Sequence, residues 1–126
     1  MTPWTRDELD RFRAAEEIEI APVGGDGSLR SAVTFWIVRL GDGLYVRSAC
    51  GRGSAWFQAA ETRHEGRISS KGIEKDMTFL DADTNLNEQI DATYRSKYRR
   101  NGAQYVNMMV CPKARLATIK LAPRLT

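Results

Sequence analysis

Alternation of apolar and polar residues with a period of two predicts β-strands along most of this chain. The runs 17–21, 44–47 and 73–81 alternate in this way, as expected for strands that bury one face. The run 64–69 is predicted to pair with 73–81 as a hairpin. The run 31–38 is apolar at both odd and even positions. That pattern predicts a central strand covered from both sides.

Turn residues join these runs into hairpins. Gly41-Asp-Gly43 predicts a tight hairpin, and Lys71-Gly72 predicts a second one. Within the second hairpin, Lys75 shares a face with apolar residues. This lysine is either an edge residue whose stem covers apolar surface or a group directed at a ligand.

Two short helices are predicted from their capping signals. Thr5 and Glu8 have the spacing of a capping box, which predicts a helix that ends near Ala15. Ser54 is a suitable N-cap for a short helix over 55–62.

Near Asp83 the apolar period changes from two to about four, which predicts a longer helix. Its basic C-terminal end, Lys97 to Arg100, is explained by solvation and by the helix dipole. The segment 103–110 stays ambiguous, and alternation over 117–121 predicts a last strand. The stripe of the longer helix consists of Leu86, Ile90, Tyr94 and Tyr98.

These elements predict one α+β domain over residues 1–126. We expect a small antiparallel β-barrel or sandwich of about six strands, with a short inserted helix and a longer helix before the last strand.

Composition and charge indicate which kinds of ligand or macromolecule the protein is suited to bind. The chain has 126 residues, 42% of them hydrophobic, and a formal net charge of +3. This mild charge does not predict a nucleic-acid-binding face, and it fits a small anionic ligand as well as no ligand. No apolar run approaches the roughly 20 residues of a membrane span. We therefore expect a cytoplasmic protein that binds neither membrane nor nucleic acid.

Few residue types suited to metal or hydrolytic chemistry are present. His64 is the single histidine, and neither it nor the two cysteines, Cys50 and Cys111, has metal-ligand spacing. No metal is therefore expected. Asp81, Asp83 and Asp91 could act as paired acids, but their place at a helix start already explains them through the helix dipole.

The segment that follows the strand 44–47 is the strongest candidate for a binding site. Gly51 and Gly53 break it, and Ser54 begins a helix whose free N–H groups could hold an anion beside Arg47 and Arg52. A plain strand-to-helix turn with two solvated arginines explains the same residues.

Five segments carry a resemblance to a known family: Trp4-Thr-Arg-Asp-Glu-Leu9, Gly51-Arg-Gly-Ser-Ala-Trp-Phe57, His64-Glu-Gly-Arg-Ile68, Glu74-Lys-Asp-Met-Thr-Phe79 and Tyr94-Arg-Ser-Lys-Tyr98. Nearly the whole chain resembles the bacterial domain of unknown function 2255, which implies no activity. More distantly, the chain is similar to the deazaflavin-dependent nitroreductases of the FMN-binding split-barrel superfamily.

The distant resemblance implies a split barrel, a homodimer with ligands at its seam, and a bound FMN or deazaflavin. The chain differs from the nitroreductases in two respects. Their loop Lys-x-Pro-Ala-Trp is shortened here to Arg52-Gly-Ser-Ala-Trp56, without the lysine, and their basic segment Gly-Arg-Lys-Ser-Gly-Lys-Pro-Arg before the second strand is reduced to Gly25-Asp-Gly-Ser-Leu-Arg30. The cofactor-binding residues implied are Arg47, Ser48, Arg52, Gly53, Ser54 and Trp56, while Tyr94 and Tyr98 would lie on the substrate side.

Three functions stay open. The first is a flavin- or deazaflavin-dependent oxidoreductase, in which the cofactor carries out the redox chemistry. A second is a cofactor-free protein that binds or transforms a small anionic or aromatic molecule, like a cyclase or isomerase. Its acid–base group would be Arg47, Arg52, His64 or a tyrosine such as Tyr94 or Tyr98. The third is a structural or interaction module.

Overall fold

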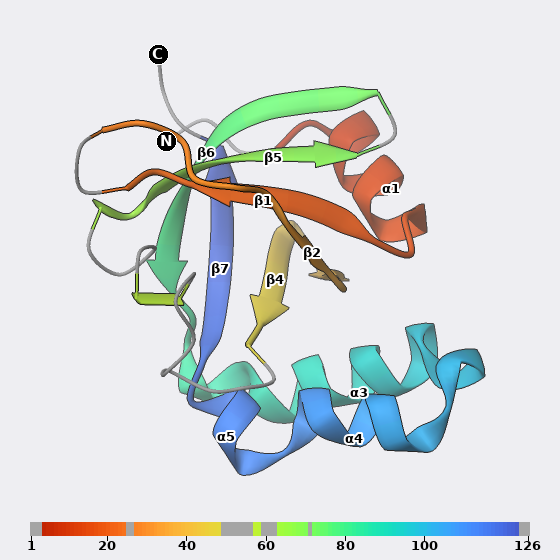
Figure 1. Ribbon diagram of the computed structural model, residues 1–126. Coiled ribbons are helices and arrows are strands. Elements are labelled where there is room, and N and C mark those ends of the chain that lie inside the picture. Colours follow the sequence, from red (N-terminus) through yellow and green to blue (C-terminus); the bar gives the residue numbers. More distant parts are fainter. Residues whose placement is uncertain (1–3, 25–26, 49–56, 59–62, 71, 124–126) are drawn as a thin grey trace.

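The computed structural model describes residues 4–24, 27–48, 57–58, 63–70 and 72–123 (Figure 1). The strands in these residues form one antiparallel sheet, and most of the helical residues follow its sixth strand. The elements are α1 (Arg6–Ala14), β1 (Ile18–Pro22), β2 (Val33–Phe35), β3 (Val38–Leu40), β4 (Gly43–Arg47), β5 (Glu65–Ser70), β6 (Ile73–Asp81), the 3-10 turn η2 (Thr84–Leu86), α3 (Asn87–Lys97), the 3-10 turn η3 (Arg99–Asn101), α4 (Ala103–Val110), α5 (Pro112–Arg115) and β7 (Thr118–Pro123).

The sheet has the strand order β2-β1-β5-β6-β7-β4-β3, and neighbouring strands are antiparallel. Both predicted hairpins are confirmed. The β3–β4 turn has Gly41 at a φ of 61°, and the β5–β6 turn has Gly72 at a φ of 81°. Glycine adopts this left-handed backbone without a steric penalty.

The segment 31–38 differs from its prediction as a central strand. It contributes β2 at one end of the strand order and the start of β3 at the other end. Only Trp36 and Ile37 separate these two strands, so the sheet must curl until its two edges meet at this corner. The α+β split-barrel prediction is confirmed, with seven strands in place of about six.

Two apolar clusters lie on opposite faces of β4. Leu44 and Val46 belong to the cluster inside the curled sheet, together with Phe12 of α1. Tyr45 points the other way, into a second cluster with Tyr94 of α3 and other helical residues. Because both faces are covered, every residue of β4 is buried.

Helix α1 packs against the first cluster and is fixed by its polar residues. The predicted capping box is present, with Glu8 N–H donating to the Thr5 hydroxyl and Thr5 N–H donating to the Glu8 carboxylate. Lys75 of β6 donates to the same carboxylate at 2.8 Å, and its ammonium lies 5.5 Å from the centre of the Trp4 ring. Lys75 therefore ties α1 to the sheet.

The helices α3, α4 and α5 form a layer beneath the curled sheet (Figure 1). The predicted stripe is confirmed at Ile90, Tyr94 and Tyr98, which are all buried. The ambiguous segment 103–110 is helix α4. Of the predicted helix over 55–62, Phe57 and Gln58 are helical and its other residues lie outside the described ones. Within the described part of the chain, we find no helix with the length and apolar character needed to span a membrane.

Candidate functional site

Arg47, the last residue of β4, lies between the sheet and the helical layer and not in solvent. The period of two along the strand places it on the face of Tyr45, which packs against α3. Its side chain is fully buried. The expectation that Arg47 is a solvated arginine is therefore wrong.

The guanidinium group of Arg47 uses all five of its N–H donors within the protein. Nε donates to the Thr118 hydroxyl at 2.9 Å, and Nη1 donates to the Met109 carbonyl at 2.9 Å and to a carboxylate oxygen of Asp91. Nη2 donates to the backbone and side-chain oxygens of Asn87 at 3.3 and 3.2 Å. The end of β4 is thereby bonded to α3, α4 and β7.

Asp91 is shared between two arginines. One carboxylate oxygen accepts from Arg47 and the other from Nε and Nη2 of Arg115. Burial would raise the pKa of Asp91, but the hydrogen bonds from Arg115 and Arg47 outweigh it, so that the pKa lies below its ordinary value. The cluster of these three side chains, which we call the Arg47 cluster, carries one excess positive charge.

Tyr94 lies next to the Arg47 cluster. The Arg47 guanidinium carbon is 5.6 Å from the centre of the Tyr94 ring, within the range of a cation–π contact. Among the described residues, the buried Tyr94 hydroxyl has no hydrogen-bond partner. Burial raises the pKa of Tyr94, so this group stays protonated at neutral pH and is a candidate hydrogen-bond donor.

Tyr98, in contrast, is occupied at the corner between β2 and β3. Its hydroxyl accepts from the Ile37 N–H at 3.0 Å and lies 2.7 Å from the Glu16 carbonyl, to which it donates. Its ring stacks on Trp36 with centroids 4.0 Å apart. These contacts give Tyr98 a positioning role, since they hold the two edges of the curled sheet to α3.

The other predicted site residues fall in three places. Ser48 follows Arg47, is buried, and donates its N–H to the Ala117 carbonyl at 3.1 Å. His64 is exposed, has a φ of 58°, and precedes β5, which β6 and β7 separate from β4. The remaining four, Arg52, Gly53, Ser54 and Trp56, lie outside the described residues.

Sequence reasoning assigned Asp91 to the helix dipole and so missed its pairing with Arg47. A signal was present, because Asn87 and Asp91 are four residues apart and lie beside the stripe that contains Ile90 and Tyr94. Two oxygen-bearing side chains at that spacing, at the margin of a buried helix face, indicate a buried cation opposite them.

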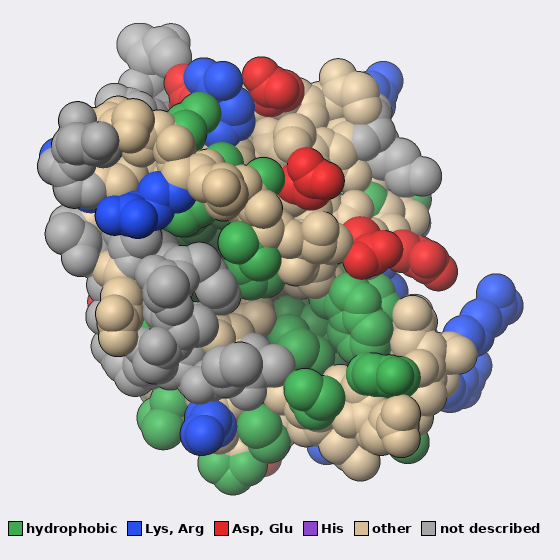
Figure 2. Space-filling view, viewed as in Figure 1, with side chains coloured by type: hydrophobic (Ala, Val, Ile, Leu, Met, Phe, Trp, Pro, Cys, Tyr) green, Lys and Arg blue, Asp and Glu red, His purple; other side chains and the backbone are tan. Residues whose placement is uncertain are grey.

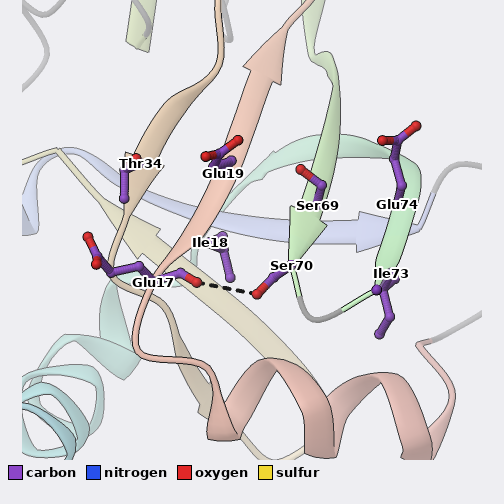
Figure 3. Close-up of a pocket in the computed structure, with 9 residues that line it drawn as sticks. Glu17, Ile18, Glu19, Thr34, Ser69, Ser70, Ile73 and Glu74 are labelled. Atoms are coloured by element: carbon purple, nitrogen blue, oxygen red, sulfur yellow. Dashed lines mark hydrogen bonds between the residues drawn. The ribbon is translucent and has the colours of Figure 1, made fainter.

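A hollow of about 610 Å³ lies at the turn of the β5–β6 hairpin, beside β1 (Figure 3). Glu19, Ser69 and Glu74 are cross-strand neighbours there, and Glu17 adds a third carboxylate. This negative lining disfavours an anionic ligand. The hollow is therefore a poor place for a phosphate-bearing cofactor.

The curled antiparallel sheet with its helical layer defines the chain as a split-barrel protein. Solved structures of the same fold support this class. HutZ, the heme storage protein from Vibrio cholerae, has a TM-score of 0.68 and 14% identity over 96% of this chain and 91% of its own. A putative pyridoxamine 5'-phosphate oxidase from Listeria innocua has a TM-score of 0.62 and 15% identity over 93% of this chain and 90% of its own. A protein described as F420 reductase has a TM-score of 0.58 and 10% identity over 92% of each chain.

The sequence places the chain more closely within this class. Residues 8–121 match the model of the family described as "Uncharacterized protein conserved in bacteria (DUF2255)", so the chain belongs to that family. Comparison with curated proteins gave no match.

Proposed function

We propose that this protein binds a planar, anionic cofactor of the flavin or deazaflavin type and serves in oxidoreductase chemistry. The observation that carries the proposal is the shared fold with proteins whose names refer to heme, pyridoxamine 5'-phosphate and F420. All three groups are flat, conjugated and anionic, and the similarity covers more than nine-tenths of this chain.

The cofactor site would begin where β4 ends. Ser48, Arg52, Gly53, Ser54 and Trp56 would hold the phosphate and the ring. Because the donors of Arg47 are all occupied, Arg47 would act from beneath the site. It would fix the start of the loop and supply positive charge, without bonding the phosphate itself.

The bound cofactor would supply the hydride or electron transfer. The protein's own residues would bind and orient it. The protonated hydroxyl of Tyr94, on α3 beside Arg47, would be a hydrogen-bond donor.

A homodimer is part of the proposal. Tyr105 and Met108 on α4 are each 52% exposed, and Leu116 after α5 is 68% exposed. Figure 2 shows hydrophobic side chains at the surface over the helical layer, in the lower half of the view. Sedimentation at micromolar concentration should give a dimer, and a monomer would contradict a site located at a seam between two copies.

Ligand titration tests the cofactor directly. The absorbance spectrum of the purified protein and titrations with FMN and with F420 should reveal one ligand with a Kd below roughly 100 μM, equivalent to more than about 5 kcal/mol of binding free energy. Arg52→Ala should weaken binding, while Arg6→Ala, at the exposed start of α1, is a control with the same loss of charge.

Trp56→Ala completes the test. Weaker binding by a variant that keeps the wild-type circular dichroism and melting temperature would support the loop as the site. Unchanged affinity in both Arg52→Ala and Trp56→Ala, at unchanged stability, would remove the loop from the proposal.

A second candidate function is cofactor-free binding or conversion of a small molecule. The saturated guanidinium of Arg47 favours it, because one of the expected phosphate ligands is already occupied. Absence of binding to both FMN and F420 would select this alternative, with the exposed His64 as the first acid–base candidate to replace.

A further inference from the structure

A basic groove lies where α1, β3 and α3 meet, away from the Arg47 cluster. Its volume is about 410 Å³, within the range of small-molecule sites. Three of its lining side chains are cationic, namely Arg13, Arg39 and Lys97. Thr93 and Ser96, on one face of α3, add hydroxyl groups.

The three cations are held to different degrees. The Arg39 side chain is 20% exposed and is fixed by Asp10 at 2.7 Å and by the Gly41 carbonyl at 2.9 Å. Lys97 donates to the Ile37 carbonyl at 2.6 Å and to the Phe12 carbonyl at 3.4 Å. Two of the cations are therefore positioned before any ligand arrives, which reduces the entropy lost on binding.

Arg13 is the cation without a counter-charge. Among the described residues it has no ion-pair partner, whereas Asp10 neutralises Arg39 and Glu16 acts electrostatically on Lys97. The three cationic side chains that line the groove have no carboxylate among the other lining residues. Burial, and then the charge of Arg13, lower the pKa of Lys97 to about 8. An anion placed between Arg13 and Lys97 would relieve this repulsion.

We infer that the groove formed by Arg13, Arg39 and Lys97 binds the phosphate group of a small phosphorylated molecule. A guanidinium fork matches the oxygens of a phosphate, and an ammonium group adds a compact positive charge. The groove also has room for an organic body beside the phosphate. Thr93 and Ser96 also line the groove, and the Thr93 hydroxyl, which donates to the Gln89 carbonyl at 2.8 Å, would serve that body as an acceptor.

Arg13 and Lys97 lie in the last turns of α1 and α3, where they also complement the helix dipoles. A purely structural role would make Arg13 affect stability alone. The test therefore reads binding and stability separately.

The experiment is a titration followed by the backbone amide signals of Thr93, Ser96 and Lys97 in ¹H–¹⁵N spectra. The probes are ribose 5-phosphate, inorganic phosphate and acetate, at constant ionic strength. We expect saturable shifts with ribose 5-phosphate at a millimolar Kd, a weaker Kd for inorganic phosphate, and no saturation with acetate.

Arg13→Gln should weaken the binding of ribose 5-phosphate about five-fold, since an exposed arginine loses one charge-assisted contact. Arg6→Gln removes the same charge from the same helix outside the groove and should leave the Kd unchanged. Linear shifts, equal effects of the two variants, or saturation by acetate with the same Kd would overturn the inference. Equal affinities for inorganic phosphate and ribose 5-phosphate would overturn the assignment to a phosphorylated organic molecule.

This inference does not depend on the proposed cofactor. Flavin binding is read from the absorbance of the ring system and from variants of the loop after β4. The phosphate site is read from amide shifts on α3 and from Arg13→Gln. The two proposals can therefore fail independently of each other.

Discussion

Replacing Asp91 by Asn removes the negative charge that Arg47 and Arg115 share. The amide has nearly the same shape, so the helix and its packing are kept. The Arg47 guanidinium then stays buried without a counter-charge, because its side chain has no exposed surface. We predict a large loss of stability from this one substitution.

The magnitude follows from burial. Breaking a buried ion pair by removing one partner costs about 3–5 kcal/mol. Arg47 keeps its bonds to Thr118, Asn87 and Met109, which places Asp91→Asn near the lower limit, at about 3 kcal/mol. Arg115→Gln breaks the other pair, but that side chain is 39% exposed, so solvent screening makes the expected loss smaller than that of Asp91→Asn.

Urea unfolding followed by circular dichroism measures both variants. With a slope of about 1.5 kcal/mol/M, the midpoint should fall by about 2 M for Asp91→Asn, and it should fall by less for Arg115→Gln. The double variant Arg47→Met/Asp91→Leu, which removes both charges, should lose about 1–3 kcal/mol less than the sum of its single variants.

The pH dependence supplies an internal check. Since the pKa of Asp91 in the folded protein lies below the ordinary 3.8, its stabilisation is complete above about pH 4 and is lost as the pH falls through the folded-state value. The difference between the wild type and Asp91→Asn should shrink over that range. A loss of under 0.5 kcal/mol for Asp91→Asn at pH 7, or a difference independent of pH, would refute the reasoning from burial.

Three further predictions concern the fold. Tyr98→Phe leaves the Ile37 N–H and the Glu16 carbonyl without this partner and should cost about 1–3 kcal/mol; an unchanged melting temperature would contradict it. Gly66→Ala would place a methyl group 2.9 Å from the Ala21 carbonyl oxygen and 3.0 Å from the Phe79 ring, with an expected cost of about 1–3 kcal/mol in urea unfolding, and a neutral result would show that the strands can separate. The pKa of Lys97 is lowered to about 8 from 10.5, so its charged form opposes folding below pH 8. The free energy of unfolding of the wild type should therefore rise relative to that of Lys97→Met between pH 8 and 10.5. Parallel plots of unfolding free energy against pH for the two proteins would disprove the shift.

Local signals carried most of the fold prediction. The capping box at Thr5, the hairpin glycines Gly41 and Gly72, and the four-residue stripe through Tyr94 each act over a few residues, and the structure contains all of them. The prediction of one central strand over 31–38 is wrong because the apolar residues of this segment belong to two strands that face different clusters. Phe35 packs inside the curled sheet, while Val38 packs against the helices on the opposite side.

The environment of Arg47 could not be read from its own segment. Whether the end of β4 meets solvent or helix depends on α3, which lies about forty residues further along the chain. The anion-binding role of the loop after β4 stays a prediction, since its key residues lie outside the described ones. The basic groove was not foreseen either, because Arg13, Arg39 and Lys97 come from three distant segments.

The position of β7 has a consequence for synthesis on the ribosome. This strand is made after the other six, yet it lies between β6 and β4. At about 5–20 residues per second, the interval between the end of β6 and the start of β7 takes about 2–7 s. During that interval the nascent chain presents two unpaired strand edges that would later flank β7, and these are the surfaces through which β-proteins aggregate. Chaperone dependence during translation should therefore end when β7 emerges.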